Sequence, residues 1–484
     1  MKKAIIIACA AMALSACAPK VAHLEHSDWA PDVKENLNAF MDEFAHSKQK
    51  NYAVFDFDNT SSIFDITENQ MQYQIDRMCF EMTPAQMHDA IRTVLDMESG
   101  HYNDALDDID TAYAHLYEKY GPFSWKGVPD EKAEALHCDP YWGEFGSKMI
   151  GIYEMILQYE TPTIAYKWDK NWVCGMTDAV LDSLSYVSHG IYSAIETRRG
   201  TWSGHESLNA KAGVRVHGYL DGFTVTDNTR ELWKTLKANG IDVWVCSASG
   251  INQVLCAIDI FGLHEYCTGV LAMTCAHDAE GKLTSEYDYN GHAFLANADG
   301  SWTEDTLPVG AMTCGPGKVT TIENCIAPKY DGRGPLACFM DSTGDFNFCT
   351  EFASTRLVVC FNRADRKVTD GGGLIAEVAI YERDVLGYDL RKAGENNDIL
   401  FLLQGRDDNG MRGLRPSNKT LRFGETEERL FANEQNEAQY EYICEHSMSV
   451  KEALETFALR TPADSSVLGF KYGFLDSYDG YRCR

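Results

Sequence analysis

The chain of 484 residues is long enough for one large domain with insertions or for two to three smaller domains. Its formal net charge of −29 gives a surface that repels phosphate backbones, which argues against nucleic acid as a partner. The acidic excess otherwise describes a solvated surface and indicates no particular chemistry.

The start of the chain has the pattern of an export signal. Two lysines precede an apolar stretch over residues 4–14, which is too short to cross a bilayer as a permanent helix. The sequence Leu14-Ser15-Ala16-Cys17 then has the form of a bacterial lipoprotein cleavage box. We therefore predict a signal peptide, lipidation of Cys17, and an exported cell-envelope lipoprotein that meets the membrane only through this anchor. An ordinary secretory signal is the alternative.

The cysteine content is compatible with disulfides. Of 16 cysteines, Cys9 lies in the signal and Cys17 at its end, which leaves 14, an even number. We expect several structural disulfides, and a small buried side chain at Cys246 in an apolar strand. Three spacings could close short loops, and none has the CxxC pattern of a zinc site: Cys267 to Cys275, Cys314 to Cys325, and Cys349 to Cys360.

The first third of the chain predicts a helix, a strand and a helical insertion. Apolar residues recur at helical spacing over residues 32–46, and the β-leaning run Tyr52 to Phe57 follows. From about residue 63 to 200 the pattern changes to long amphipathic helices, one of them beginning at Thr83 and Pro84 as N-cap and first residue. This segment is rich in tryptophan and tyrosine, which we expect mainly to pack between helices.

The middle of the chain alternates helices with apolar strands. A helix from Asn228 ends at Gly240 and leads into Val243 to Cys246. The alternating short stretches within residues 276–308 predict a β flap. Further strands are expected at Pro335 to Met340, Arg356 to Phe361 and Ile399 to Leu403, with helices near 375–385 and after Ser449. The alternation predicts a parallel α/β sheet.

Polar residues that follow the apolar strands form the candidate site, because ligands of parallel sheets bind outside the carboxyl ends of the strands. There are four such segments, namely Asp56-Phe57-Asp58-Asn59-Thr60, Ser247, Lys318 at a helix start, and Asp341-Ser342-Thr343-Gly344-Asp345. In this order they resemble the four motifs of the haloacid dehalogenase superfamily. The resemblance covers roughly residues 50 to 365.

The resemblance implies an α/β fold with a Rossmann-like parallel sheet as the core and an inserted helical cap. The expected organisation is a signal peptide at 1–16, a core at 17–62 and 205–400 that includes the flap at 276–308, a cap at 63–204, and a C-terminal extension at 401–484.

The resemblance also implies a Mg²⁺-dependent phosphatase. Asp56 would be the nucleophile that forms an aspartyl-phosphate, and Asp58 the acid/base that protonates the leaving alcohol. Dehalogenating members lack this second acid, so dehalogenation is not expected. By resemblance, Mg²⁺ would be held by Asp56, the Asp58 carbonyl, Asp341 and Asp345, the hard oxygen ligands that this ion prefers. Ser247 and Lys318 would bind the phosphate.

The position of the insertion and the first motif are similar to those of the phosphoserine phosphatase and bacterial phosphorylcholine phosphatase branches. In both branches a carboxylate shortly after the first motif meets a positive nitrogen of the substrate, and Asp65 and Glu68 stand at that place here. The expected substrate is therefore a small amine-bearing phosphate ester, with cap aromatics as further contacts to the cation. Two alternatives stay open, a broad phosphate-scavenging phosphatase and a lipid-tethered binding protein without catalysis.

Overall fold

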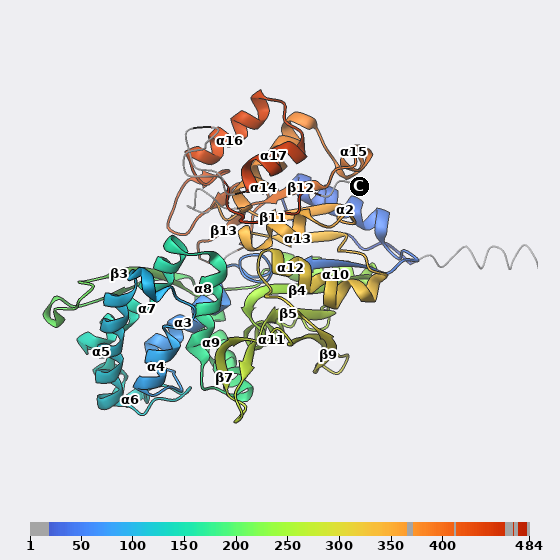
Figure 1. The fold of residues 1–484 in the computed structure, drawn as a ribbon. Coiled ribbons are helices and arrows are strands. Elements are labelled where there is room, and N and C mark those ends of the chain that lie inside the picture. Colours follow the sequence, from blue (N-terminus) through green and yellow to red (C-terminus); the bar gives the residue numbers. More distant parts are fainter. Residues whose placement is uncertain (1–18, 365–370, 411–412, 460–467, 469–472, 482–484) are drawn as a thin grey trace, which may run out of the picture.

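The computed structural model describes residues 19–364, 371–410, 413–459, 468 and 473–481 (Figure 1). The predicted signal peptide and Cys17 lie outside these residues. Among the described helices, none combines the length and apolar character needed to cross a membrane.

An eight-stranded sheet forms the centre of the molecule, in the order β12-β11-β10-β1-β4-β5-β8-β9. The strands from β12 to β5 pair in parallel, and β8 and β9 continue the sheet in antiparallel orientation. This confirms a mixed α/β protein with a largely parallel sheet. The strand bounds are β1 Asn51–Phe55, β4 Ile241–Gly250, β5 Gly269–Met273, β8 His292–Ala296, β9 Trp302–Pro308, β10 Ala337–Met340, β11 Leu357–Phe361 and β12 Leu400–Gln404.

The central strands are apolar on both faces because helices cover both sides of the sheet. In β1, Ala53 and Phe55 belong to one hydrophobic cluster, while Tyr52 and Val54 belong to the other. The first face is covered by α2 Pro31–Phe44, α10 Asp227–Ala238, α11 Ile251–Ile260 and α15 Leu390–Glu395. The second face is covered by α12 Pro316–Thr321, α13 Phe346–Thr350, α14 Gly371–Tyr381 and α17 Val450–Ala458.

The predicted helical insertion is a separate lobe with its own hydrophobic cluster, at the lower left of Figure 1. Thr83 caps α4 in a capping box, as its sequence predicts. The hairpin of β2 Arg198–Ser203 and β3 Val216–Asp221 packs on α7, so the expected boundary between residues 204 and 205 separates two paired strands. The lobe helices are α3 Ile66–Arg77, α4 Pro84–Ala90, α5 Asn103–Tyr120, α6 Asp130–His137, α7 Pro140–Tyr159, α8 Pro162–Trp168 and α9 Asp178–Ser193.

The predicted flap at 276–308 divides into two parts. Strands β8 and β9 extend the central sheet, while β6 Cys275–His277 and β7 Leu283–Tyr287 form a two-stranded sheet of their own. Backbone hydrogen bonds join Leu283 of β7 to Gly175 and Met176 of the helical lobe. The segment therefore links the lobe to the sheet.

The C-terminal part is not a separate extension beginning at residue 401, because β12 spans that position and pairs with β11 inside the sheet. It continues with a small sheet and with α16 Glu434–Glu445, which packs beside α14 together with α17 (Figure 1). Ser449 caps α17 in the predicted position. The small sheet consists of β13 Arg406–Asp407, β14 Gly413–Leu414, β15 Thr420–Leu421 and β16 Glu428–Arg429.

The expected disulfides are wrong for the described residues, in which all thirteen cysteines are free thiols. The three proposed loop closures do not form, because these cysteines lie mostly in the interior as small apolar side chains. Cys246 is fully buried in β4, as predicted.

Candidate active site

Two aspartates meet because β1 and β10 are parallel neighbours. The Cα of Phe55 pairs with that of Phe339, so the next residues of both strands emerge at the same sheet edge. Asp56 follows β1 and donates its backbone N–H to the Phe339 carbonyl at 3.1 Å. Asp341 follows β10, and both side chains are buried.

Asp345 and Lys318 complete a buried charge cluster at this edge. One carboxylate oxygen each from Asp56, Asp341 and Asp345 lies within 4.8 Å of the others. The Nζ of Lys318, on α12, donates to Oδ1 of Asp56 at 2.7 Å and to Oδ1 of Asp345 at 2.6 Å. The lysine side chain is only 1% exposed, so its charge acts inside the protein.

Burial controls the protonation of these groups. It raises the pKa of Asp56 and of Asp345 to about 6, although the Lys318 ammonium opposes the rise. Burial also disfavours a charge on Lys318, but the carboxylates of Asp345 and Asp56 raise its pKa well above the ordinary value. The lysine is therefore cationic at neutral pH, between acids that are not fully ionised without further positive charge.

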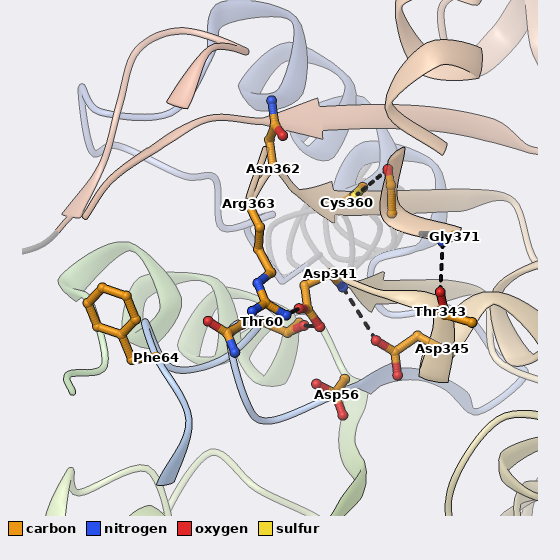
Figure 2. Close-up of polar contacts among 12 residues, drawn as sticks. Asp56, Thr60, Phe64, Asp341, Thr343, Asp345, Cys360, Asn362, Arg363 and Gly371 are labelled. Carbon is orange, nitrogen blue, oxygen red and sulfur yellow. Dashed lines mark hydrogen bonds and ion pairs between the residues drawn. The ribbon is translucent and has the colours of Figure 1, made fainter. Parts of the chain in front are cut away.

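Asp341 is held from two sides (Figure 2). Oδ1 accepts the hydroxyl hydrogen bond of Thr60 at 3.3 Å, and Oδ2 pairs with the Arg363 guanidinium at 3.0 Å. Its backbone N–H donates to Oδ2 of Asp345 at 3.4 Å. These contacts fix the carboxylate toward Asp56.

Asp58 lines the same cavity but is not part of the three-carboxylate cluster, and it has its own partners. Oδ1 accepts the Ile66 backbone N–H at 2.7 Å, and Oδ2 accepts the Ser249 hydroxyl. Burial, followed by the charges of Asp65 and Asp56, raises its pKa well above the ordinary value. This carboxyl group therefore retains a proton at a pH where an exposed aspartate would have lost it.

The predicted phosphate-binding Ser247 ends the apolar part of β4 but does not line the cavity beside Asp56. It is fully buried, and its Oγ accepts the Ser249 backbone N–H at 3.0 Å. Ala248 and Ser249 line the cavity instead. Strand β4 continues through Gly250 with an irregular register between Cys246 and Gly250, so residues after Ser247 lie nearer the sheet edge.

The carboxylates face a cavity of about 80 Å³, here called the aspartate cavity. Lys318, Asp65 and Glu68 line it, so the predicted site residues other than Ser247 and Cys17 converge there. Asp65 is the N-cap of α3 and accepts the Glu68 backbone N–H at 2.9 Å. The helical lobe contributes further lining residues, namely Tyr153, Tyr166 and Asp169.

The donor set suits a hard divalent cation. Seven carboxylates line the cavity against two basic groups, Lys318 and Arg363. Four of the seven belong to the first and fourth motifs, namely Asp56, Asp58, Asp341 and Asp345. Lys318 contacts only Oδ1 of Asp56 and Oδ1 of Asp345, while Oδ2 of Asp345 accepts the Asp341 backbone N–H at 3.4 Å. Buried carboxylates in excess of their counter-charges are stabilised by a metal ion bound through oxygen.

Sequence reasoning missed several contacts in this site. Arg363 stands two residues beyond β11, so the rule used for Asp56 and Asp341 could have identified it. Thr60 belongs to the first predicted segment and Ser249 stands two residues after Ser247, but only the fold shows that Thr60 contacts Asp341 and that Ser249 contacts Asp58. Tyr153 and Tyr166 carry no local signal, because they lie inside α7 and α8, and Asp169 directly follows α8.

No protein-family model matches the chain, and no curated protein matches it at a significant level. Among solved structures, a conserved protein of unknown function from Anaerococcus prevotii DSM 20548 is 21% identical with a TM-score of 0.62, covering 83% of this chain and 99% of that one. The two proteins share a fold. Cytosolic 5'-nucleotidase IIIB bound to cytidine is 13% identical with a TM-score of 0.27, covering 69% of this chain and 78% of that one.

Proposed function

We propose that the chain is a Mg²⁺-dependent phosphomonoesterase of the haloacid dehalogenase type that works through an aspartyl-phosphate. The observation that carries the proposal is the buried cluster of Asp56, Asp341 and Asp345 with Lys318, at one edge of a parallel sheet. Asp58 beside it, with a raised pKa, supplies the second chemical function that a phosphatase needs.

Asp56 acts as nucleophile in the first step. One carboxylate oxygen attacks phosphorus, the P–O bond to the alcohol breaks, and the electron pair leaves with the alcohol oxygen. Lys318 donates to Asp56, and its charge offsets the repulsion between the carboxylate and the incoming phosphate dianion. The Lys318 contact also holds the nucleophile in one orientation.

Asp58 handles the protons in both steps. Its protonated form gives a proton to the departing alkoxide, which leaves as the alcohol. The resulting Asp58 carboxylate then takes a proton from water as the water oxygen attacks the phosphorus of the aspartyl-phosphate. The bond to Asp56 breaks, phosphate leaves, and both carboxyl groups return to their starting states.

The residues that would hold Mg²⁺ are Asp56, Asp341 and Asp345, with the backbone carbonyl of Asp58. Bound there, the ion would neutralise charge on the phosphate oxygens and on the carboxylates. Arg363 and Thr60 position Asp341 for this task. At the end of β4, we assign the phosphate contact to Ala248 and Ser249 in place of Ser247, because these two residues line the cavity.

The helical lobe acts as the cap over the site in this proposal. Tyr153, Tyr166 and Asp169 come from the lobe and close one side of the aspartate cavity. Glu68, Tyr153 and Tyr166 line this cavity, and a carboxylate together with aromatic side chains is a lining that suits a substrate ammonium group. This supports an amine-bearing phosphate ester, with Glu68 the better ligand because Asp65 already caps α3.

The direct test is phosphatase activity of the purified chain on p-nitrophenyl phosphate with Mg²⁺, with and without chelator. D56N should lose all activity, and D58N should lose about a hundredfold or more in kcat. D242N is the control, because Asp242 is the second residue of β4, at the end of the strand away from the site, and pairs with Lys50. Full activity in D56N, or activity insensitive to chelator, would contradict the mechanism.

A panel of monoesters separates the remaining alternatives. Preference for phosphorylcholine or phosphoserine over neutral esters supports the amine-bearing substrate, whereas equal rates on all esters indicate a broad scavenging phosphatase. No turnover on any ester would favour the binding protein. We also propose export and lipidation at Cys17, which a C17S variant tests through loss of fatty-acid labelling.

A further inference from the structure

A second and larger cavity adjoins the aspartate cavity. It has a volume of about 350 Å³, at the low end of the roughly 300–1,000 Å³ found for small-molecule sites. Asn59, Asp65, Glu68 and Arg363 line both cavities, so the two share a wall. We call the larger one the arginine cleft.

Four arginines from separate segments converge on this cleft. Arg199 comes from β2 of the helical lobe, Arg363 follows β11, Arg406 lies in β13, and Arg422 follows β15. Against them stand three carboxylates, those of Asp65, Glu68 and Asp408, so the lining is positive on a chain of net charge −29. Arg363, Arg406 and Arg422 already pair with Asp341, Asp408 and Glu425. A guanidinium group carries five N–H donors, more than one carboxylate takes up, so these arginines can also donate to an anion in the cleft.

The arginines divide into a floor and a rim. Arg406 is 3% exposed, pairs with Asp408 at 2.8 Å, and donates to the Asn59 carbonyl at 3.1 Å, so it is a fixed part of the floor. Arg199 is exposed and lies 5.7 Å from the ring centre of Phe423. Arg422 lies 3.8 Å from Glu425. The rim thus presents guanidinium groups from the lobe and from the C-terminal sheet.

We propose that the arginine cleft binds a second phosphate group of the substrate while the first lies at Asp56. Guanidinium groups match phosphate oxygens in bidentate geometry, and several of them suit a group that carries close to two charges. Phe64, Tyr219 and Phe423 supply apolar wall for the organic part between the phosphates. This inference rests on the proposed function, and it concerns the far end of the substrate rather than the amine near Glu68.

The experiment uses two matched pairs of compounds, fructose 6-phosphate with fructose 1,6-bisphosphate, and AMP with adenosine 3',5'-bisphosphate. For at least one pair, kcat/KM should be about tenfold or more higher for the bisphosphate, which corresponds to about 1.4 kcal/mol. R199A and R422A should each lower that ratio by about fivefold or more. R198A should leave the ratio unchanged, because Arg198 is the next residue on β2 and pairs with Asp221.

Binding to the inactive D56N variant, measured by calorimetry, gives a readout without turnover. The bisphosphate of the preferred pair should bind more tightly than its monophosphate, and added salt should reduce the difference. Equal affinities within both pairs, or the same ratio in R199A as in R198A, would overturn the inference. Turnover of p-nitrophenyl phosphate reports the proposed function separately, so a failure of the chemistry is distinguishable from a failure of the cleft.

Discussion

Replacing Lys318 by methionine should destabilise the metal-free protein and make it depend on Mg²⁺. The ammonium group is buried between Asp56 at 2.7 Å and Asp345 at 2.6 Å, with Asp341 in the same cluster. Removing one partner of a buried ion pair costs about 3–5 kcal/mol, because the remaining charge loses its compensation. Mg²⁺ bound to the buried carboxylates that have lost the ammonium group should restore part of this loss by mass action.

The pH dependence follows from the same groups. Burial raises the pKa of Asp56 and Asp345 to about 6 from the ordinary 3.8, and losing the ammonium of Lys318 raises both values further. Because the folded pKa then lies further above the unfolded one, folding of the variant takes up protons, and its stability rises as the pH falls. The difference in free energy of unfolding between the parent chain and K318M at pH 5 should be roughly half of the difference at pH 8, or less.

A matched control exists in the helical lobe. Lys148 is also 1% exposed and pairs with Glu144 at 2.5 Å and with Asp108 at 3.6 Å. K148M should therefore lower the free energy of unfolding by a similar amount, and Mg²⁺ should not restore it. Urea denaturation of both variants, with chelator and with Mg²⁺, measures the difference. Equal Mg²⁺ responses in K318M and K148M would refute the assignment of the cluster.

Three further predictions concern protons. The rise in melting temperature caused by Mg²⁺ should shrink between pH 7.5 and pH 5 in thermal-shift scans, because protons compete for Asp56 and Asp345 as the pH falls through about 6; a constant rise contradicts this. S249A should reduce kcat by about tenfold. Because the Ser249 hydroxyl lowers the pKa of Asp58, S249A should also move the alkaline limb of the kcat–pH profile to higher pH. S249T, which keeps a hydroxyl, should retain more activity. Burial lowers the pKa of His189 to about 3, so only the unfolded state gains a proton there between pH 6.5 and pH 4.5. The free energy of unfolding of the parent chain should therefore fall by about 2–3 kcal/mol over this range through His189. In urea titrations H189Q should lack this pH dependence; equal pH dependence in the two proteins would argue against it.

The sequence predicted the strands of the sheet well where burial on both faces makes them continuously apolar. β1, β10 and β11 appear within a few residues of their expected positions. The sequence did not predict the partners of strands in which apolar and polar residues alternate. The alternation at 292–308 predicts a hairpin, but it does not indicate that β8 of this hairpin pairs with β5, because strand pairing depends on contacts distant in sequence.

The site was predictable to the extent that topology determines it. Asp56 and Asp341 converge because parallel strands end at one edge, a rule that needs no side-chain detail. Which residues at the end of β4 line the cavity was not predictable, since it depends on how far β4 continues beyond its apolar part. The disulfide expectation failed for a related reason, because an even number of cysteines says nothing about their distances.

Arg363 connects the two cavities through its charge. It lines both, and its guanidinium pairs with Asp341 at 3.0 Å. A cation bound at Asp341 would share that carboxylate with Arg363 and weaken the ion pair, which would leave more of the arginine's charge directed to the arginine cleft. An anion in the cleft would draw on the same guanidinium and leave more negative charge on Asp341 for the cation. Because each ligand favours the other through one shared arginine, the coupling between the cavities is reciprocal and needs no change of fold.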